Sequence, residues 1–167
     1  MMKRKERIDI TLSIYPNSYG FGFTVAENFK ELIDYGVVKI SPIQNKKTLK
    51  RFLEFLDFYK PQVVVLRNYS EKNTRKSSRI LKLIDKMVLK AKEKKMKVFK
   101  YSREDIKNVF DQFDSKTKYE ICKTLIKWYP QLKQKMPKAR KAWESDSYSM
   151  SYFDALSLLI THLYISA

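Results

Sequence analysis

The chain has few of the residues on which many common active sites depend. Its one cysteine, Cys122, excludes an internal disulfide and a cysteine-based zinc site, and we expect a small core residue. Its one histidine, His162, argues against histidine-rich metal sites, and we expect it to be structural. Three glycines in 167 residues exclude a glycine-rich phosphate loop. One cysteine also fits a reducing compartment, so we expect a cytoplasmic protein.

Long apolar runs are also lacking. None approaches the ~20 residues that cross a bilayer, and the mean hydropathy is −0.49. The basic residues 1–7 lead into an alternating pattern rather than the apolar stretch of a signal peptide, so we expect no membrane partner. Hydrophobic residues (44%) suffice for a core, and we expect residues 1–167 to form a single domain.

Acidic residues are scarce relative to basic ones. The chain has 35 Lys and Arg against 18 Asp and Glu, a formal charge of +17. Residues 46–118 hold 22 of the basic and 9 of the acidic residues, so the middle of the chain carries most of the excess. Such an excess is typical of proteins that bind polyanions, above all nucleic acids. The alternative is a lysine-rich, solvated surface without a partner.

Hydrophobic periodicity predicts five strands. Residues 8–15, 19–25 and 32–40 alternate or are rich in β-forming residues and are separated by short turns, so they form an antiparallel meander. Residues 63–66 are a continuous apolar run, which is typical of a strand buried on both faces. Residues 97–101 complete the set.

Helical spacing appears between and after the later strands. Ser115 is a candidate cap for one of these helices, and the proline- and lysine-rich residues 130–142 predict a basic loop. The predicted helices cover residues 46–59, about 80–91, 103–110, 116–128 and about 148–165. This order predicts an α/β fold, a mixed five-stranded sheet with two helix-linked parallel strands and helices on both faces, similar to the RNase H-like superfamily.

Motifs near both ends resemble the RuvC-type Holliday-junction resolvases. Residues 14–18, Ile-Tyr-Pro-Asn-Ser, and the Gly-Phe-Gly at 20–22 resemble the first strand, Ile-Asp-Pro-Gly-Ser, and the second strand of that family. Residues 153–158, Phe-Asp-Ala-Leu-Ser-Leu, with Thr-His at 161–162, resemble its last helix. Two motifs also resemble those of a bacterial group of RuvC-like proteins. They are Tyr-Pro-Asn at 15–17 and Trp-Glu-Ser…Phe-Asp-Ala at 143–155.

The resemblance implies hydrolysis of phosphodiesters by two Mg²⁺ ions that four carboxylates hold. At those positions this chain has Tyr15, Arg67 (or Asn68, one residue on), Ser151 and Asp154, so only one acid remains. Two dications need several anionic oxygens. We therefore expect degraded or absent catalysis and no cofactor, with Tyr15 filling the metal cavity and Arg67 pairing with Asp154 or with a phosphate.

Two alternatives stay open. Glu144 or Asp146 could join Asp154 in an active endonuclease that uses Mg²⁺ or Mn²⁺. The chain could instead be a protein-interaction scaffold. A homodimer is expected from the resemblance, and Phe52, Phe55 and Phe58 could form its interface or belong to the core.

The basic residues nearest the expected site are candidates for nucleic-acid binding. Some follow the fourth strand and others lie near the start of the helix after residue 115; the resemblance places Lys107 and Lys118 near the scissile phosphate. Since no recognition-helix signature is present, we expect phosphate-driven binding of branched or double-stranded DNA rather than RNA. The candidates are Lys72, Arg75, Lys76, Arg79, Lys107, Lys116 and Lys118.

Overall fold

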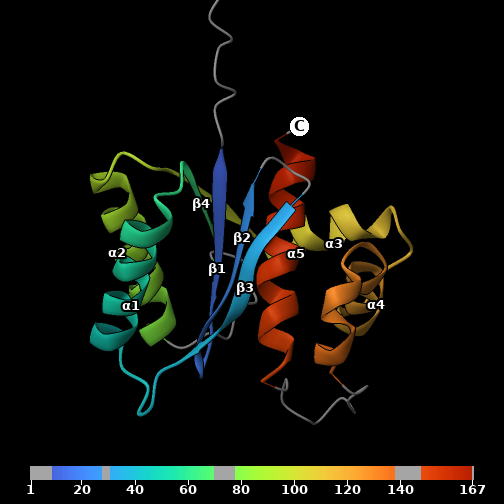
Figure 1. The fold of residues 1–167 in the computed structure, drawn as a ribbon, viewed down its shortest axis with the longest axis horizontal. Coiled ribbons are helices and arrows are strands. Elements are labelled where there is room, and N and C mark those ends of the chain that lie inside the picture. Colours follow the sequence, from blue (N-terminus) through green and yellow to red (C-terminus); the bar gives the residue numbers. More distant parts are fainter. Residues whose placement is uncertain (1–8, 28–30, 70–77, 138–147, 167) are drawn as a thin grey trace, which may run out of the picture.

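The computed structural model describes residues 9–27, 31–69, 78–137 and 148–166, and its centre is a five-stranded sheet (Figure 1). The strands follow the order β3-β2-β1-β4-β5 across the sheet. β1 pairs with β2, and β2 with β3, in antiparallel fashion, whereas β1–β4 and β4–β5 are parallel. This confirms the predicted mixed sheet. The strands are β1 (Ile10–Pro16), β2 (Gly20–Glu27), β3 (Glu31–Lys39), β4 (Val63–Arg67) and β5 (Lys97–Tyr101).

Helices cover both faces of the sheet, as predicted. The crossovers α1 (Asn45–Tyr59) and α2 (Ser78–Glu93) pack on one face. On the other face, α5 (Met150–Ile165) lies against the sheet, and α3 (Arg103–Asp111) and α4 (Lys118–Trp128) lie outside it (Figure 1). Because α5 is enclosed from both sides, its sequence is apolar nearly all round rather than amphipathic. No helix among the described residues is long and apolar enough to cross a membrane.

Two local predictions were wrong. Thr117, not Ser115, caps α4, because its side chain accepts a hydrogen bond from the Glu120 amide (3.1 Å). Ser115 is buried and shares a hydrogen bond with Thr124. Within the predicted basic loop, Pro130–Lys135 forms a 3₁₀-helix, since proline suits a first helical position and needs no amide partner there. Residues 138–142 of that loop lie outside the described residues.

The three phenylalanines of α1 have different surroundings. Phe52 is fully buried, and Phe55 packs edge-on against Phe21 and Phe23, so both belong to the core. Phe58 is 78% exposed. Only Phe58 of the three is therefore available on the surface.

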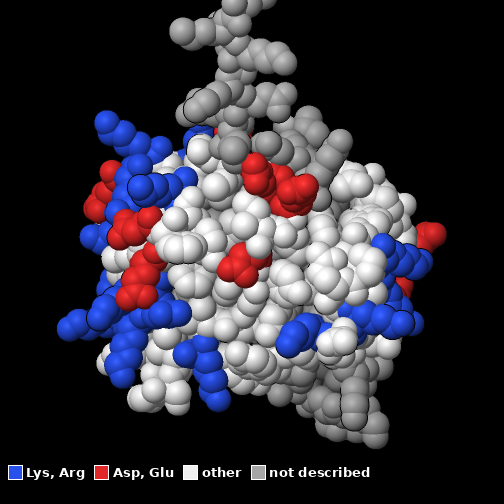
Figure 2. Space-filling view, viewed as in Figure 1, with Lys and Arg blue, Asp and Glu red and all other residues white. Residues whose placement is uncertain are grey.

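The basic residues of the central segment are divided unequally between the two faces of the sheet, with more of them on α1 and α2 than on α3. Residues 46–118 build α1 and α2 on one side and α3 on the other. Figure 2 shows Lys and Arg mainly at the two flanks, over α1 and α2 on one side and over α3 and α4 on the other, while the middle of this view carries acidic side chains. The charge that looks continuous in the sequence is thus divided by the fold.

Candidate functional site

The position of α5 on the sheet depends on small residues in β1 and β2. A Cβ at Gly22 would lie 2.1 Å from the carbonyl oxygen of Ser151, so α5 approaches the β2 backbone as closely as glycine allows. The Ser13 hydroxyl donates to the carbonyl of Ala155 (2.6 Å). These contacts hold the first turns of α5, and with them Asp154, against the sheet.

The four positions that the resemblance assigns to metal ligands, Tyr15, Arg67, Ser151 and Asp154, lie around the same region of the sheet. The parallel pairing of Ile14 with Leu66 brings the next residues, Tyr15 and Arg67, to the ends of neighbouring strands. Ser151 and Asp154 are one turn apart on α5. All four side chains are buried. Three of these four residues, Tyr15, Arg67 and Ser151, carry no carboxylate.

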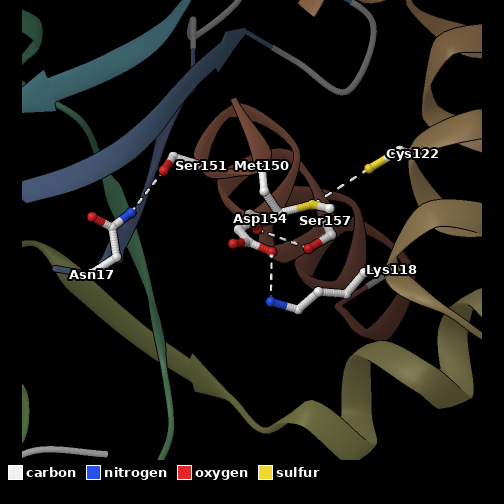
Figure 3. A network of polar contacts seen from close by, with 7 residues as sticks. All are labelled: Asn17, Lys118, Cys122, Met150, Ser151, Asp154 and Ser157. Carbon is white, nitrogen blue, oxygen red and sulfur yellow. Dashed lines mark hydrogen bonds and ion pairs between the residues drawn. The ribbon is translucent and has the colours of Figure 1, made fainter. Parts of the chain in front are cut away.

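Asp154 forms an ion pair with Lys118, the first residue of α4 (Figure 3). The Nζ–Oδ1 distance is 3.5 Å, and the side chains of Lys118 and Asp154 are 24% and 12% exposed. An ammonium group thus balances the charge of the one remaining family carboxylate. This contact joins residues 36 positions apart, and the sequence alone did not predict it.

Ser151 is held by Asn17, in the turn between β1 and β2 (Figure 3). The Asn17 amide nitrogen donates to the Ser151 hydroxyl (2.9 Å), and its Oδ1 accepts from the amides of Tyr19 and Gly20. The Pro-Asn-Ser sequence signals such a turn. Its link to α5 has no sequence signal, so Asn17 was missed as a site residue.

Arg67 lies along the ends of β4 and β5. Its Nη1 donates to the carbonyl oxygens of Asn68 and Tyr101, and its guanidinium lies 4.5 Å from the centre of the Tyr69 ring. Burial raises the pKa of Tyr69, and the nearby Tyr15 and the charge of Asp154 raise it further, whereas Arg67 opposes these effects. Tyr15, Arg67 and Asp154 thus lie near enough to Tyr69 to influence its ionisation. A direct pairing of Arg67 with Asp154 stays a prediction.

These donors do not fit a pair of Mg²⁺ ions. Nowhere in the described parts of the chain do three or more His, Cys, Asp or Glu side chains gather in a way that could hold a metal. The family positions supply a phenol, a guanidinium, a hydroxyl and one carboxylate that already faces Lys118. Glu144 and Asp146, the acids that could compensate, lie outside the described residues.

A small hollow opens beside the Lys118–Asp154 pair, between α3, α4 and α5. Arg103 and Lys118, each the first residue of its helix, supply two cationic side chains. Arg103 was missed, although the capping box of Ser102 and Asp105 fixes the start of α3. The other lining residues are Ile121, Cys122, Met150, Phe153, Asp154 and Ser157.

The other predicted binding residues are scattered. Lys107 on α3 and Lys116 just before α4 are exposed. Arg79 is half-buried and donates to Asn45 Oδ1 and to the carbonyl of Asn17 (both 3.1 Å), and burial lowers its pKa. It therefore ties the starts of α1 and α2 to the β1–β2 turn. Lys72, Arg75 and Lys76 lie outside the described residues.

Cys122 and His162 are core residues, as predicted. The Cys122 sulfur lies 3.6 Å from that of Met150. His162 shares a 2.7 Å hydrogen bond with the Tyr101 hydroxyl and packs against Phe99, and burial lowers its pKa.

Comparison with known proteins gives matches in structure but not in sequence. No family model and no curated protein matches the chain. The structure of Thermus thermophilus RuvC superposes with a TM-score of 0.67 at 19% identity, covering 94% of this chain and 95% of that one. The complex of T. thermophilus RuvC with a Holliday junction substrate gives 0.65 at 20% identity, with coverage of 95% and 94%.

A eukaryotic protein is also similar. The yeast mitochondrial Holliday junction resolvase Ydc2 gives a TM-score of 0.58 at 14% identity, covering 93% of this chain and 80% of that one. In all three cases the match extends over almost the whole of this chain. The chain therefore has the RNase H-like fold of the RuvC-type Holliday junction resolvases, as its end motifs predict.

Proposed function

We propose that this protein binds nucleic acid, specifically branched or double-stranded DNA, and lacks the two-metal hydrolysis of RuvC-type resolvases. The observation that carries the proposal is the Lys118–Asp154 ion pair at the one family position that keeps its acid. Residues 1–167 would act as one domain, in the cytoplasm.

DNA is the favoured partner because of fold and charge together. A protein with this fold, T. thermophilus RuvC, has been solved with a Holliday junction substrate, and that structure covers 95% of this chain. The formal charge of +17 provides attraction to phosphate at long range. The exposed Lys107 and Lys116 belong to the same layer of helices as the hollow. Binding of this kind releases counterions and weakens steeply with salt.

Cleavage is not expected because the charge at the site has the wrong sign for metal ions. Asp154 contributes one negative charge, whereas Lys118 and Arg67 contribute two positive ones. A pair of dications would meet net repulsion there, while a phosphate would meet attraction. Mg²⁺ or Mn²⁺ would act only if Glu144 or Asp146 adds the missing charge.

A binding assay combined with a cleavage assay tests this function. Fluorescence anisotropy would be measured for a four-way DNA junction, a DNA duplex and an RNA duplex, over a salt series in EDTA. Each DNA would then be incubated with Mg²⁺ or Mn²⁺. We expect salt-sensitive binding that favours DNA, and intact DNA after incubation.

Two other results would support the alternatives. Metal-dependent cleavage that is lost in Asp154→Asn would indicate an active nuclease assisted by Glu144 or Asp146. The absence of salt-sensitive binding to any of these nucleic acids would instead indicate a protein-interaction scaffold. A homodimer would use surfaces other than Phe52 and Phe55, which are part of the core.

A further inference from the structure

We propose that Arg103 and Lys118, at the mouth of the hollow between α3, α4 and α5, bind a nucleic-acid phosphate without metal, and that Asp154 restrains this binding by competing for Lys118. The inference rests on the proposed function and assigns an inhibitory role to the residue that would serve catalysis in a metal-dependent relative. It concerns the hollow lined by Arg103, Lys118, Asp154 and Ser157 together with apolar side chains.

The charges that line the hollow favour an anion. Two cationic side chains, Arg103 and Lys118, face one carboxylate, that of Asp154. The hollow itself has room for about one water molecule, so a phosphate would sit at its mouth. There it gains from the cationic excess, and a guanidinium such as that of Arg103 suits phosphate through its paired N–H donors. A divalent cation would have to displace the Lys118 ammonium and would then have one protein carboxylate from this lining as a ligand, fewer than Mg²⁺ usually needs.

The geometry of the ion pair allows exchange of partners. Lys118 and Asp154 are 3.5 Å apart, which is longer than the roughly 2.7–2.9 Å of a tight charge-assisted hydrogen bond. The Lys118 side chain is 24% exposed and that of Asp154 only 12%, so the ammonium is the more accessible of the two. An ammonium group has three donors and rotates freely about its flexible stem. Lys118 can therefore turn toward a phosphate while Asp154 stays behind it.

The direction of one mutational effect separates this site from a metal site. If Asp154 holds a metal that binds DNA, its loss weakens DNA binding. If Asp154 competes with phosphate for Lys118, its loss strengthens DNA binding. The two mechanisms therefore predict opposite signs for Asp154→Asn, measured with all divalent metal removed.

The experiment is DNA-duplex binding by fluorescence anisotropy in EDTA, on the full chain. We expect Asp154→Asn to tighten binding about two- to fivefold, since Lys118 no longer has to leave an ion pair in order to reach the phosphate. We expect Lys118→Met to weaken it about tenfold and to reduce the salt slope by about one, and Arg103→Met to act in the same direction. When Lys118→Met is already present, adding Asp154→Asn should change the affinity for DNA very little.

Controls matched in charge distinguish local from general effects. Asp111→Asn removes an exposed acid at the end of α3, and Lys127→Met removes an exposed lysine of α4, and neither residue lines the hollow. Equal effects from the controls and the site variants would overturn the proposal, as would unchanged or weaker binding by a folded Asp154→Asn protein. If thermal melting shows that this variant is unfolded, DNA binding by Lys118→Met is compared with that by Lys127→Met. Weaker binding by Lys118→Met supports the proposal, and equal binding by the two variants overturns it.

The outcome for the wild-type protein separates the two proposals. Absence of DNA binding by the wild type would overturn the proposed function and this inference with it. Salt-sensitive binding by the wild type with no difference between site variants and controls would overturn the inference alone.

Discussion

The two faces of the sheet are built from different kinds of residue. Between the sheet and α1/α2, the buried residues of the described chain are apolar except Thr48, whose hydroxyl donates to the Gln44 carbonyl. The face covered by α5 buries many polar groups. These are Ser13, Thr24, Arg67, Ser115, Ser151, Asp154, Ser157, Thr161 and His162.

This difference shows which face carries a site. Buried polar groups cost stability unless they have hydrogen-bond partners, and on the α5 face many have partners within the protein. The Ser157 hydroxyl donates to the carbonyl oxygen of Asp154 (2.8 Å), and the Thr161 hydroxyl donates to that of Ser157 (2.7 Å). The α1/α2 face only has to bury apolar surface. The buried polar groups, and with them the candidate site, therefore gather on the α5 face.

The largest effect is expected on the apolar face. Phe52→Ala should lower the free energy of unfolding by about 3–5 kcal/mol, because it opens a cavity in a fully buried position. Ser157→Ala, on the α5 face, should cost about 1 kcal/mol, since it removes one hydrogen bond. Urea denaturation measures both values. Equal losses would mean that the two faces do not differ in the way described.

A smaller loss is expected where α5 approaches the sheet. Gly22→Ala should lower the free energy of unfolding by roughly 1–3 kcal/mol, because the new methyl group would overlap the Ser151 carbonyl and displace α5. The control is Gly36→Ala, whose Cβ would meet the Phe23 ring at 2.9 Å. This contact is longer than the one at Gly22 and is made with a side chain rather than with backbone, so Gly36→Ala should cost less stability. A Gly22→Ala protein as stable as the wild type would contradict the close packing of α5.

The Asn17–Ser151 hydrogen bond should couple the turn to α5. A double-mutant cycle with Asn17→Ala and Ser151→Ala should give a coupling energy of about 0.5–1.5 kcal/mol. Asn17→Ala also removes the Oδ1 acceptor for Tyr19 and Gly20, but this loss is the same with and without Ser151 and cancels from the coupling energy. Additive effects in urea denaturation would show that the bond does not position α5.

The smallest effect is a dependence of stability on pH through His162. Burial lowers the pKa of His162 in the folded protein from its ordinary value of 6.5, so below that pH the unfolded chain binds the proton more readily. Stability should therefore fall as the pH decreases below 6.5. In His162→Gln this part of the pH dependence should vanish in urea denaturation at several pH values. The same slope in both proteins would assign the effect to other groups.

Strand and helix patterns in the sequence predicted the architecture well, because burial on a sheet has a clear period. The alternation over residues 8–15 and the continuous run at 63–66 correspond to β1 and β4. Capping was less predictable, since Ser115 and Thr117 can both cap a helix and tertiary contacts decide between them.

The composition of the site was predictable and its contacts were not. The resemblance predicts that Tyr15, Arg67, Ser151 and Asp154 lie near one another, and in the structure they lie where β1, β4 and the start of α5 meet. The contact of Asp154 with Lys118 depends on how α4 packs on α5, which no local pattern encodes. The division of basic residues between two faces likewise follows from the crossovers of the chain rather than from its composition.

Metal binding in solution tests the central claim most directly. Wild-type protein and Asp154→Asn would be titrated with Mn²⁺, and the bound ion measured by electron paramagnetic resonance at millimolar concentrations. Because Lys118 already balances Asp154 and the neighbouring family positions carry no carboxylate, we predict no specific Mn²⁺ binding and identical titrations for both proteins. Two Mn²⁺ ions bound by the wild type and lost in Asp154→Asn would contradict the account.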